Sequence, residues 1–363
     1  MNSQIFIMKK NLFNMYGSLV PDGEMLKVKQ FSILVLNSLF AVSFVNAAAD
    51  KTAMADDLYQ QAVIPWEQGR SSGWELMLKA ADAGNTEAMC LIANSYMTSA
   101  LVSSKESDMY FERAAKAGGL CGMLALSDIG SGPILSSSLT ETNGSENWSD
   151  KVVAKSKHLA EKDDLEGIKT YAFIYAARKD YNTYCKWLER AAKLGDADSM
   201  NKLSAAIRDG CGWYIVPGSR DKAVRHWIEQ AANHGNPRAM EVMSSYAEKD
   251  KDIVGMLGWL ERAANTGNIN SIRIYSTYLM GGDDFTIPIP ADMQNNKKAY
   301  AWLYVLTHQL PPETEESAYS RSVKELSILG KKLSVNEIED AKSWANKWMK
   351  THQVRSYFLE FGM

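Results

Sequence analysis

The sequence predicts an all-α fold: a right-handed α-solenoid of about six to seven helix–turn–helix repeats that ends in a C-terminal capping helix. Two observations support this fold class. A motif that ends in Ala-Ala-x-x-Gly recurs along the chain, and every copy is followed by a second pattern with helical spacing. The clearest copies are Trp74–Gly84, Met109–Gly118, Trp187–Gly195, Trp227–Gly235 and Trp259–Gly267.

The composition is that of a folded chain without excess basic charge. Hydrophobic residues make up 46% of the 363 residues and charged residues 23%, so global disorder is excluded. The formal net charge is −3, from 40 Lys and Arg against 43 Asp and Glu. Because this balance does not favour a phosphate backbone, the sequence argues against a nucleic-acid partner.

The segment 1–49 is typical of a secretory signal peptide. An uncharged apolar run, Phe31–Val45, follows two lysines and precedes Ala47–Ala49, which is the order of a cleavable signal. A start at Met25 would make residues 1–24 an over-extension of the reading frame. We therefore expect export to the periplasm of a bacterial source, without stable membrane insertion after cleavage. An uncleaved membrane anchor is the alternative.

The repeat array is expected over residues 50–311. Its glycines are separated by 34, 77, 40 and 32 residues, and the longest interval contains a degenerate copy in which Asp163 replaces the glycine. Each glycine is expected to end one helix before the next begins. A small residue follows four positions after each glycine position and Met or Ile follows at the fifth, which suits close helix packing. The small residues are Ala88, Gly122, Gly167, Ser199, Ala239 and Ser271.

This period of paired helices, with Ala-Ala-x-x-Gly closing the second helix and an aromatic residue before it, resembles the Sel-one-like repeat family, a relative of the tetratricopeptide repeats. The likeness extends from Asp56 to Leu310 and includes loop details, such as the Gly-containing turn Asp209–Gly212. The departure lies in the repeat with Asp163, whose interhelical loop is also enlarged. The resemblance implies a helical solenoid that serves as an adaptor for other proteins.

Residues 312–363 break the repeat and are expected to form a helical cap and tail. Ser334, with Glu337 three residues later, indicates a capping box that opens an amphipathic helix. This helix would cover the apolar face of the last repeat, which no further repeat buries. The apolar tail, Val354–Met363, is expected to fold back on the cap, with partner binding as the alternative.

Two long inserts interrupt the short turns. Gly130–Asp150 is rich in Ser, Gly and Asn, and Trp148 is its candidate contact with a partner; a mobile insert without a role is the alternative. Gly281–Asn296 carries Phe285 between acidic residues and prolines, which stiffen the loop and make it the better preorganised one. Both aromatic residues are candidate partner-binding residues.

A stripe of polar residues is the main candidate binding surface. In helical solenoids the first helix of each repeat lines the concave side, where a protein or peptide would be held. The residues three and six positions after the glycines form a stripe of mixed sign that could meet a complementary charged surface; an ordinary solvated face is the alternative. These candidate partner-binding residues are Glu87, Asp198, Asn201, Arg238, Glu241, Asn270 and Arg273.

The sequence contains no catalytic constellation. Its five histidines lack metal-ligand spacing with a second His or Cys, and no nucleophile or phosphate-loop motif occurs. The recurring tryptophans have the period of the repeat itself and are interpreted as its core. The sequence therefore predicts no catalytic, cofactor-binding or metal-binding residues.

Four cysteines in an exported chain allow three disulfide pairings. Cys185–Cys211 is the expected pair, because an antiparallel helix hairpin brings both residues to the same end. Cys90 and Cys121 occupy equivalent helices, whose axes usually lie about 8–10 Å apart, and this pair is less well supported. Four reduced, buried thiols are the alternative. Because no cysteine precedes Cys90, a lipid-modified N-terminal cysteine is not expected.

The sequence predicts a non-enzymatic periplasmic scaffold whose partner is another protein. The resemblance implies that exported bacterial members of the family include regulators of sensor kinases and immunity proteins against secreted antibacterial phospholipases. The leading hypothesis is an immunity protein that neutralises a type VI secretion effector of the phospholipase class. A periplasmic regulatory adaptor of an envelope signalling protein or sensor kinase is the alternative, and a cell-wall-active enzyme is a third possibility.

Overall fold

The computed structural model describes residues 52–97, 103–129, 147–282, 287–312 and 318–356. The chain divides into two compact parts, Met1–Met54 and Ala55–Met363. The expected signal peptide at residues 1–49 lies outside the described residues.

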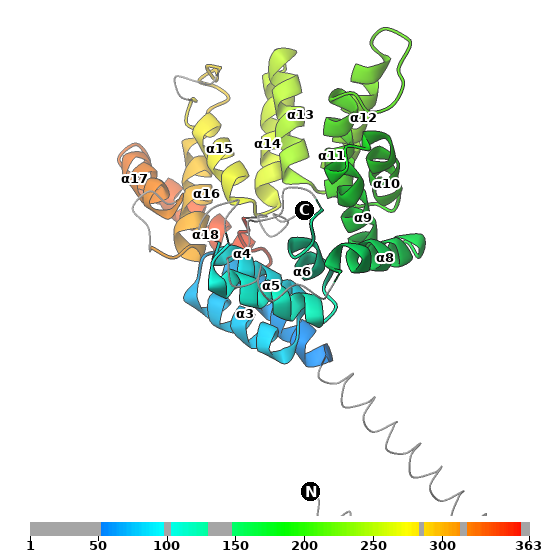
Figure 1. Cartoon of the computed structure of the whole chain (residues 1–363). Coiled ribbons are helices and arrows are strands. Elements are labelled where there is room, and N and C mark those ends of the chain that lie inside the picture. Colours follow the sequence, from blue (N-terminus) through cyan, green and yellow to red (C-terminus); the bar gives the residue numbers. More distant parts are fainter. Residues whose placement is uncertain (1–51, 98–102, 130–146, 283–286, 313–317, 357–363) are drawn as a thin grey trace, which may run out of the picture. The chain divides into compact units, whose positions relative to one another are not determined.

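In the part of the chain that the structure describes, seven helix pairs follow one another, and two further helices come after them (Figure 1). In Figure 1, α4, α6 and α9 lie nearer the middle of the array than their partners α5, α8 and α10. The described residues are therefore an α-solenoid, as the sequence predicts. The seven repeats pair helix 52–67 with α3 (Ser71–Ala83), α4 (Thr86–Ser95) with α5 (Lys105–Lys116), α6 (Leu120–Ala125) with α8 (Trp148–Glu161), α9 (Leu165–Ala177) with α10 (Tyr181–Lys193), α11 (Ala197–Arg208) with α12 (Ser219–Asn233), α13 (Pro237–Lys249) with α14 (Ile253–Asn265), and α15 (Ile269–Leu279) with α16 (Asn296–Gln309).

Four turns between repeats are a glycine followed by an Asn or Asp cap, whereas Gly118 is followed by Gly119, which makes no side-chain cap. The glycine takes a left-handed conformation, with φ between 85° and 114° in Gly84, Gly195, Gly235 and Gly267. The next side chain accepts a hydrogen bond from a backbone N–H in the first turn of the following helix, which stabilises that helix by about 1 kcal/mol. The capping pairs are Asn85 with Ala88, Asp164 with Gly167, Asp196 with Ser199, Asn236 with Ala239, and Asn268 with Ser271.

The degenerate repeat keeps this turn without its glycine. Asp163 has a positive φ of 62°, a conformation that Asp tolerates better than most side chains. Its carboxylate also accepts a hydrogen bond from the Nε of Arg190, at 2.6 Å. The substitution therefore preserves the local geometry, and stacking continues through this repeat.

Small residues at the fourth position allow the helices of neighbouring repeats to pack closely. Ala88, Ser199, Ala239 and Ser271 are completely buried. At Gly167 an added Cβ would lie 2.4 Å from the Cβ of Leu159, so even alanine would force the helices apart. The Met and Ile residues at the fifth position are buried in the core, as expected. They are Met89, Met123, Ile168, Met200, Met240 and Ile272.

The recurring tryptophans pack on the core to different degrees. Trp302 is fully buried, whereas Trp187 and Trp259 are half-buried and lie beside core clusters. The guanidinium groups of Arg190 and Arg262, three residues later in each motif, lie 5.2 and 4.1 Å from the ring centroids of these two tryptophans. In both Trp-Leu-Glu-Arg segments, the arginine guanidinium thus lies over the indole ring of the tryptophan in the same segment.

The C-terminal cap consists of α17 (Ala318–Gly330) and α18 (Val335–Met349). The predicted capping box is confirmed, because Ser334 and Glu337 exchange both of its hydrogen bonds. Trp348 of α18 packs edge-on against Trp302 of α16, with ring centroids 5.2 Å apart. Val354 is fully buried, so the first part of the tail folds back as expected; residues 357–363 lie outside the described residues.

Both cysteine pairs lie at disulfide distance. The expected pair, Cys185 and Cys211, has a Cα–Cα distance of 6.5 Å, and the less supported pair, Cys90 and Cys121, has one of 6.4 Å. The start of α6 lies closer to α4 than ordinary helix packing allows because Gly119 has no side chain. A Cβ on Gly119 would lie 2.7 Å from the side chain of the first residue of α4.

Candidate protein-binding surface

The predicted polar stripe lies at the beginning of the first helices of the repeats. The new helix begins two residues after the glycine, so the residue three positions after the glycine is the second residue of that helix. The residue six positions after the glycine lies about one turn further along the same side. Glu166 and Lys169 of α9, which follows the turn at Asp163, occupy the same positions. We call the complete set the inner stripe. It consists of Glu87, Glu166, Lys169, Asp198, Asn201, Arg238, Glu241, Asn270 and Arg273.

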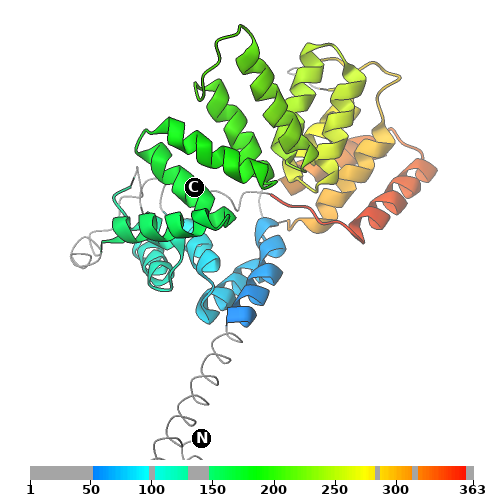
Figure 2. The same ribbon diagram turned by 90° about the vertical axis from the view of Figure 1, so that its right-hand side faces the viewer.

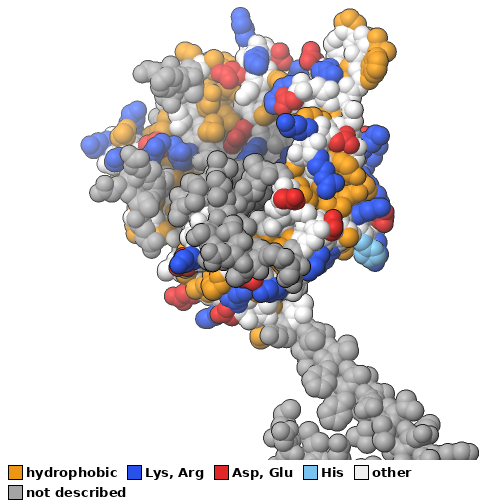
Figure 3. Space-filling model, in the orientation of Figure 1, with side chains coloured by type: hydrophobic (Ala, Val, Ile, Leu, Met, Phe, Trp, Pro, Cys, Tyr) orange, Lys and Arg blue, Asp and Glu red, His pale blue; other side chains and the backbone are white. Residues whose placement is uncertain are grey.

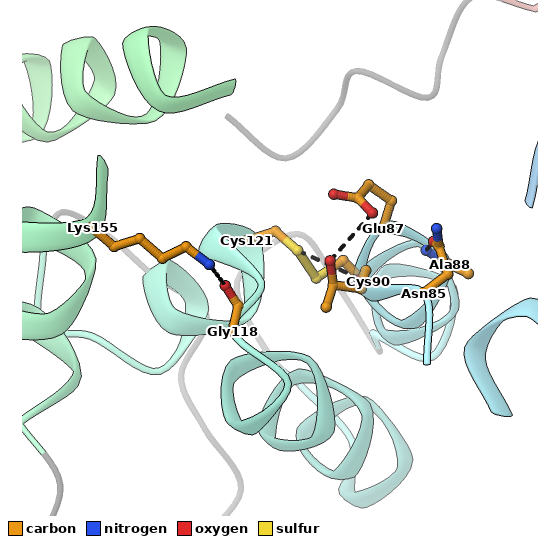
Figure 4. The surroundings of a disulfide bond; sticks show 8 residues. Asn85, Glu87, Ala88, Cys90, Gly118, Cys121 and Lys155 are labelled. Carbon is orange, nitrogen blue, oxygen red and sulfur yellow. Dashed lines mark hydrogen bonds between the residues drawn. A yellow bond between two sulfur atoms is a disulfide. The ribbon is translucent and has the colours of Figure 1, made fainter. Parts of the chain in front are cut away.

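One end of the inner stripe is acidic. Desolvation, and then the charges of Glu87 and Asp164, raise the pKa of Glu166, although part of its side chain reaches solvent. Burial and Glu87 also raise the pKa of Tyr59 in the first repeat. Figure 4 shows Glu87 beside the Cys90–Cys121 disulfide. First helices from repeats 1, 2 and 4 therefore bring their polar side chains near one another.

The middle of the inner stripe contains charges that are paired within the chain. The Nζ of Lys202 lies 2.7 Å from a carboxylate oxygen of Asp198, one helical turn away. Lys169 lies 3.9 Å from Asp196, the cap of the next repeat. Asp198 is half-buried, and its charge adds to burial in raising the pKa of Tyr184. Both signs of charge are thus fixed in place here.

The far end of the inner stripe alternates in sign. Burial raises the pKa of Glu241, which accepts a hydrogen bond from the Ser271 hydroxyl at 2.5 Å and is also influenced by Arg238. Burial, and then the nearby Arg321, lower the pKa of Arg273. Asn270 is exposed. This end therefore offers a carboxylate, guanidinium groups and an amide within consecutive repeats.

A C-terminal segment, residues 353–356, joins the two ends of the array. The backbone of Arg355 bonds to both sides of the turn before α15, donating to Gly267 O at 2.8 Å and accepting from Ile269 N at 3.0 Å. Its guanidinium binds Glu67 of the first repeat through two hydrogen bonds of 2.8 and 2.9 Å. Figure 2 shows the C-terminal chain running from the last helix towards the middle of the array.

Gln68 and Gln309 complete this junction. The Gln68 side chain donates to the carbonyl of Val354 at 3.1 Å, and Val354 N donates to the Gln309 side chain at 2.6 Å. Arg70, also in the first repeat, donates to the Gln309 carbonyl at 2.6 Å. The first and seventh repeats are therefore held by the same segment.

One of the two predicted aromatic contact residues does not belong to this surface. Trp148 was expected to be available on the Ser-rich insert, but it is only 5% exposed and lies in the core, so that expectation is wrong. The physical reason is that Asn147 caps α8, which makes Trp148 the first residue of a packed helix. Phe285 lies outside the described residues.

Several residues of this surface were not predicted from the sequence. Glu166 and Lys169 occupy the same repeat positions as the predicted residues, and the degenerate motif around Asp163 was a sufficient signal to find them. Glu67 and Arg355 had no such signal, because they are separated by 288 residues and lie outside the repeat positions.

The described residues contain no group of three or more His, Cys, Asp or Glu side chains that could hold a metal ion. Among the described helices, none is long and apolar enough to cross a membrane. The chemistry that this surface does offer is charge pairing and hydrogen bonding to another polar surface.

The recurring Gly-capped helix pairs define the chain as a solenoid with the Sel-one-like repeat fold. No protein-family model and no curated protein matches it. A similar solved structure is a protective antigen of uropathogenic Escherichia coli with an SLR fold, at 15% identity and a TM-score of 0.39, covering 82% of this chain. The chain spans only 61% of that antigen.

Two further solved structures are similar. A Sel1 repeat protein from Oxalobacter formigenes matches at 18% identity and a TM-score of 0.39, over 85% of this chain and 90% of its own. An immunity protein from Pseudomonas aeruginosa matches at 16% identity and a TM-score of 0.32, over 68% of this chain and 81% of its own.

Proposed function

We propose that the chain is a non-enzymatic periplasmic scaffold that binds another protein through the inner stripe. The observation that carries this proposal is the set of charged and polar side chains, of both signs, on the first helices of repeat 2 and of repeats 4 to 7. Such a set suits a folded partner with a complementary charge pattern, because it fixes orientation and register along the array. The partner proposed is an antibacterial effector of the phospholipase class, delivered by a type VI secretion system, which the chain neutralises as an immunity protein.

Two features support the proposed compartment. Residues 1–49 have the charge, apolar and small-residue order of a secretory signal. Both cysteine pairs lie at disulfide distance, which suits an oxidising compartment such as the periplasm. An immunity protein against a toxin that enters from outside would act in this compartment.

The inner stripe would contribute selectivity more than raw affinity. Asp198 and Glu241 already have partners within the chain, Lys202 and Ser271 respectively. A protein that binds here must offer these carboxylates cations or hydrogen-bond donors that bind them at least as strongly as their intrachain partners do, because a half-buried charge left without a partner is costly. Only a partner with the matching pattern would therefore bind tightly.

The test is stoichiometric inhibition of purified phospholipase effectors by the purified chain. We expect inhibition at equimolar amounts, and the double variant Arg238→Glu with Asn270→Arg should raise the inhibition constant at least about tenfold. Both residues are exposed near a helix start, so the fold should survive their replacement.

The matched control reverses two exposed charges on second helices, Lys186→Glu in α10 and Glu229→Lys in α12, and should inhibit like the wild type. Inhibition that is indifferent to the inner-stripe variant would exclude this surface. Binding of an envelope sensor instead of any effector would replace the immunity role with that of a regulatory adaptor. Turnover of lipid or cell-wall substrate by the pure chain would contradict the non-enzymatic assignment.

A further inference from the structure

A short loop between α11 and α12 carries large apolar side chains into solvent. In this apolar loop, residues 212–217, Trp213 is 87% exposed, Ile215 80% and Val216 69%. Figure 1 shows the loop projecting beyond the ends of its two helices, and Figure 3 shows hydrophobic side chains gathered at its tip. Scattered exposed apolar residues need no explanation, but three within four residues mark a contact surface.

The apolar loop is braced at its base. Cys211, directly before it, lies at disulfide distance from Cys185, and its N–H donates to Ala206 O at 2.9 Å. Arg220 donates to the carbonyls of Cys211 and Gly212 at 3.1 and 3.3 Å, and its guanidinium lies 4.9 Å from the centre of the Tyr214 ring. Tyr214 thus points inward and its neighbours outward. A loop held in this way loses little freedom on binding.

The surroundings of the apolar loop argue against a membrane. Its base carries the basic residues Arg208, Arg220 and Lys222, balanced by Asp209 and Asp221. Loops and helices that bind anionic bilayers combine apolar side chains with a clear excess of Lys and Arg. The local excess of one positive charge is too small to supply that attraction.

The size of the apolar loop argues against a second copy of the chain. A stable interface involves about 20–30 residues on each side, and two loops meeting tip to tip would bury only a few side chains each. Val254, 69% exposed at the beginning of α14, lies at the same end of the array, where Arg225 of α12 is 3.5 Å from Asp250. Even with Val254 included, the exposed apolar patch contains far fewer residues than a stable dimer interface needs.

We infer that the apolar loop is a second contact for a protein partner, with Trp213 entering an apolar pocket of that partner and Ile215 and Val216 packing at its edge. Tryptophan is enriched among residues that dominate binding, and it does so when it fills a pocket and its neighbours exclude water. The balanced charges at the base suit the polar rim of such a contact. This inference goes beyond the proposed function, because it assigns a surface outside the inner stripe and does not depend on the partner being a toxin.

The test places the photo-crosslinking residue p-benzoylphenylalanine at position 213 of the full chain in cells that express it naturally. The crosslinked protein is identified, purified and titrated directly against the chain. We expect the crosslink to map to an apolar pocket of that protein, Trp213→Ala to weaken binding by about 30-fold or more, and Ile215→Ala to weaken it less. Val335→Ala is the matched control, since Val335 is 71% exposed on α18, and it should bind normally.

Other results would overturn the inference. No crosslink at position 213, a crosslink to a polar surface, or unchanged affinity of Trp213→Ala would exclude the pocket. Co-sedimentation with vesicles of phosphatidylethanolamine and phosphatidylglycerol, lost in Trp213→Ala, would assign the loop to a membrane. A dimer in sedimentation velocity that Trp213→Ala dissociates would assign it to a second copy. A loop variant that loses binding while the inner-stripe variant keeps it would leave this inference standing without the proposed function.

Discussion

The inner stripe and the apolar loop differ in how far their side chains are already engaged. Asp198 and Glu241 have partners in the chain, and the segment around Arg355 ties the ends of the array together. Trp213 and Ile215 contact mainly solvent, on a loop whose base is braced. The comparison teaches that one surface already engages its charges within the chain, whereas the other leaves large apolar side chains exposed to solvent.

The largest expected effect is on stability, at the junction of the two ends. Arg355→Met would leave the Glu67 carboxylate, whose side chain is only 1% exposed, without its cation. An uncompensated buried charge typically lowers the free energy of unfolding by about 3–5 kcal/mol. Urea denaturation of the wild type and variant measures this loss.

Two matched variants sharpen this prediction. Arg208→Met removes a guanidinium from the exposed pair with Asp209 and should cost less than about 1 kcal/mol. Adding Glu67→Gln to Arg355→Met removes the orphaned charge and should recover part of the loss. If Arg355→Met is as mild as Arg208→Met, the two ends of the array are not joined in solution.

Removing either disulfide should have the next largest effect. The disulfides Cys90–Cys121 and Cys185–Cys211 close loops of similar length, with separations of 31 and 26 residues, and replacing both cysteines of a pair with alanine opens its loop. Each paired replacement should lower the free energy of unfolding by about 2–4 kcal/mol. Only the second pair should also loosen the apolar loop, which a fluorescence anisotropy decrease at Trp213 would report in a background without other exposed tryptophans. Free thiols in the oxidised wild type would contradict both predictions.

The repeat could be predicted from the sequence, but the junction between the two ends of the array could not. Gly84, Gly195 and their equivalents predict where helices end, because a left-handed turn and a cap are local requirements. Glu67 and Arg355 meet only because the small rotations between seven stacked repeats add up to a particular curvature, and no local sequence pattern encodes this total curvature. Small differences in the packing between repeats therefore determine whether the two residues meet, and this contact cannot be predicted from the sequence.

The same distinction explains the errors at the candidate site. Trp148 seemed to belong to a Ser-rich insert, yet Asn147 is a helix cap and the indole is core. Average helix spacing gives the Cys90–Cys121 pair little support, but Gly119 permits a closer approach than that average. The sequence does not mark the apolar loop, because Trp213 and Ile215 are residue types typical of a core, and only their exposure in the structure distinguishes them.

A smaller effect is expected at Glu241 of the inner stripe, where burial raises the pKa of the carboxyl. A folded protein whose acid has a raised pKa holds its proton more tightly than the unfolded chain. Stability therefore falls as the pH rises from the ordinary value of 4.5 through the raised one, and stays lower above it. Glu241→Gln removes this cost and keeps an acceptor for Ser271, so it should raise the melting temperature at neutral pH by about 1–2 °C.

Calorimetry from pH 4 upward tests this, with a flatter pH profile expected for Glu241→Gln than for the wild type (about one titrating group fewer). Glu229→Gln, on the exposed side of α12, is the control and should leave the profile unchanged. A variant that is less stable at neutral pH would mean that the ionised carboxylate is stabilised in the fold, contrary to the direction argued here.

The smallest effect on stability is expected where the effect on binding should be largest. Trp213 is 87% exposed, so Trp213→Ala removes almost no packing and should change the free energy of unfolding by less than about 0.5 kcal/mol. Trp302→Ala, at a fully buried position, should cost about 3–5 kcal/mol. A near-zero result at Trp213 in urea denaturation means that the fold does not need this side chain, as the inferred contact with a partner requires. A loss comparable to that at Trp302 would instead show that the loop packs against the array in solution.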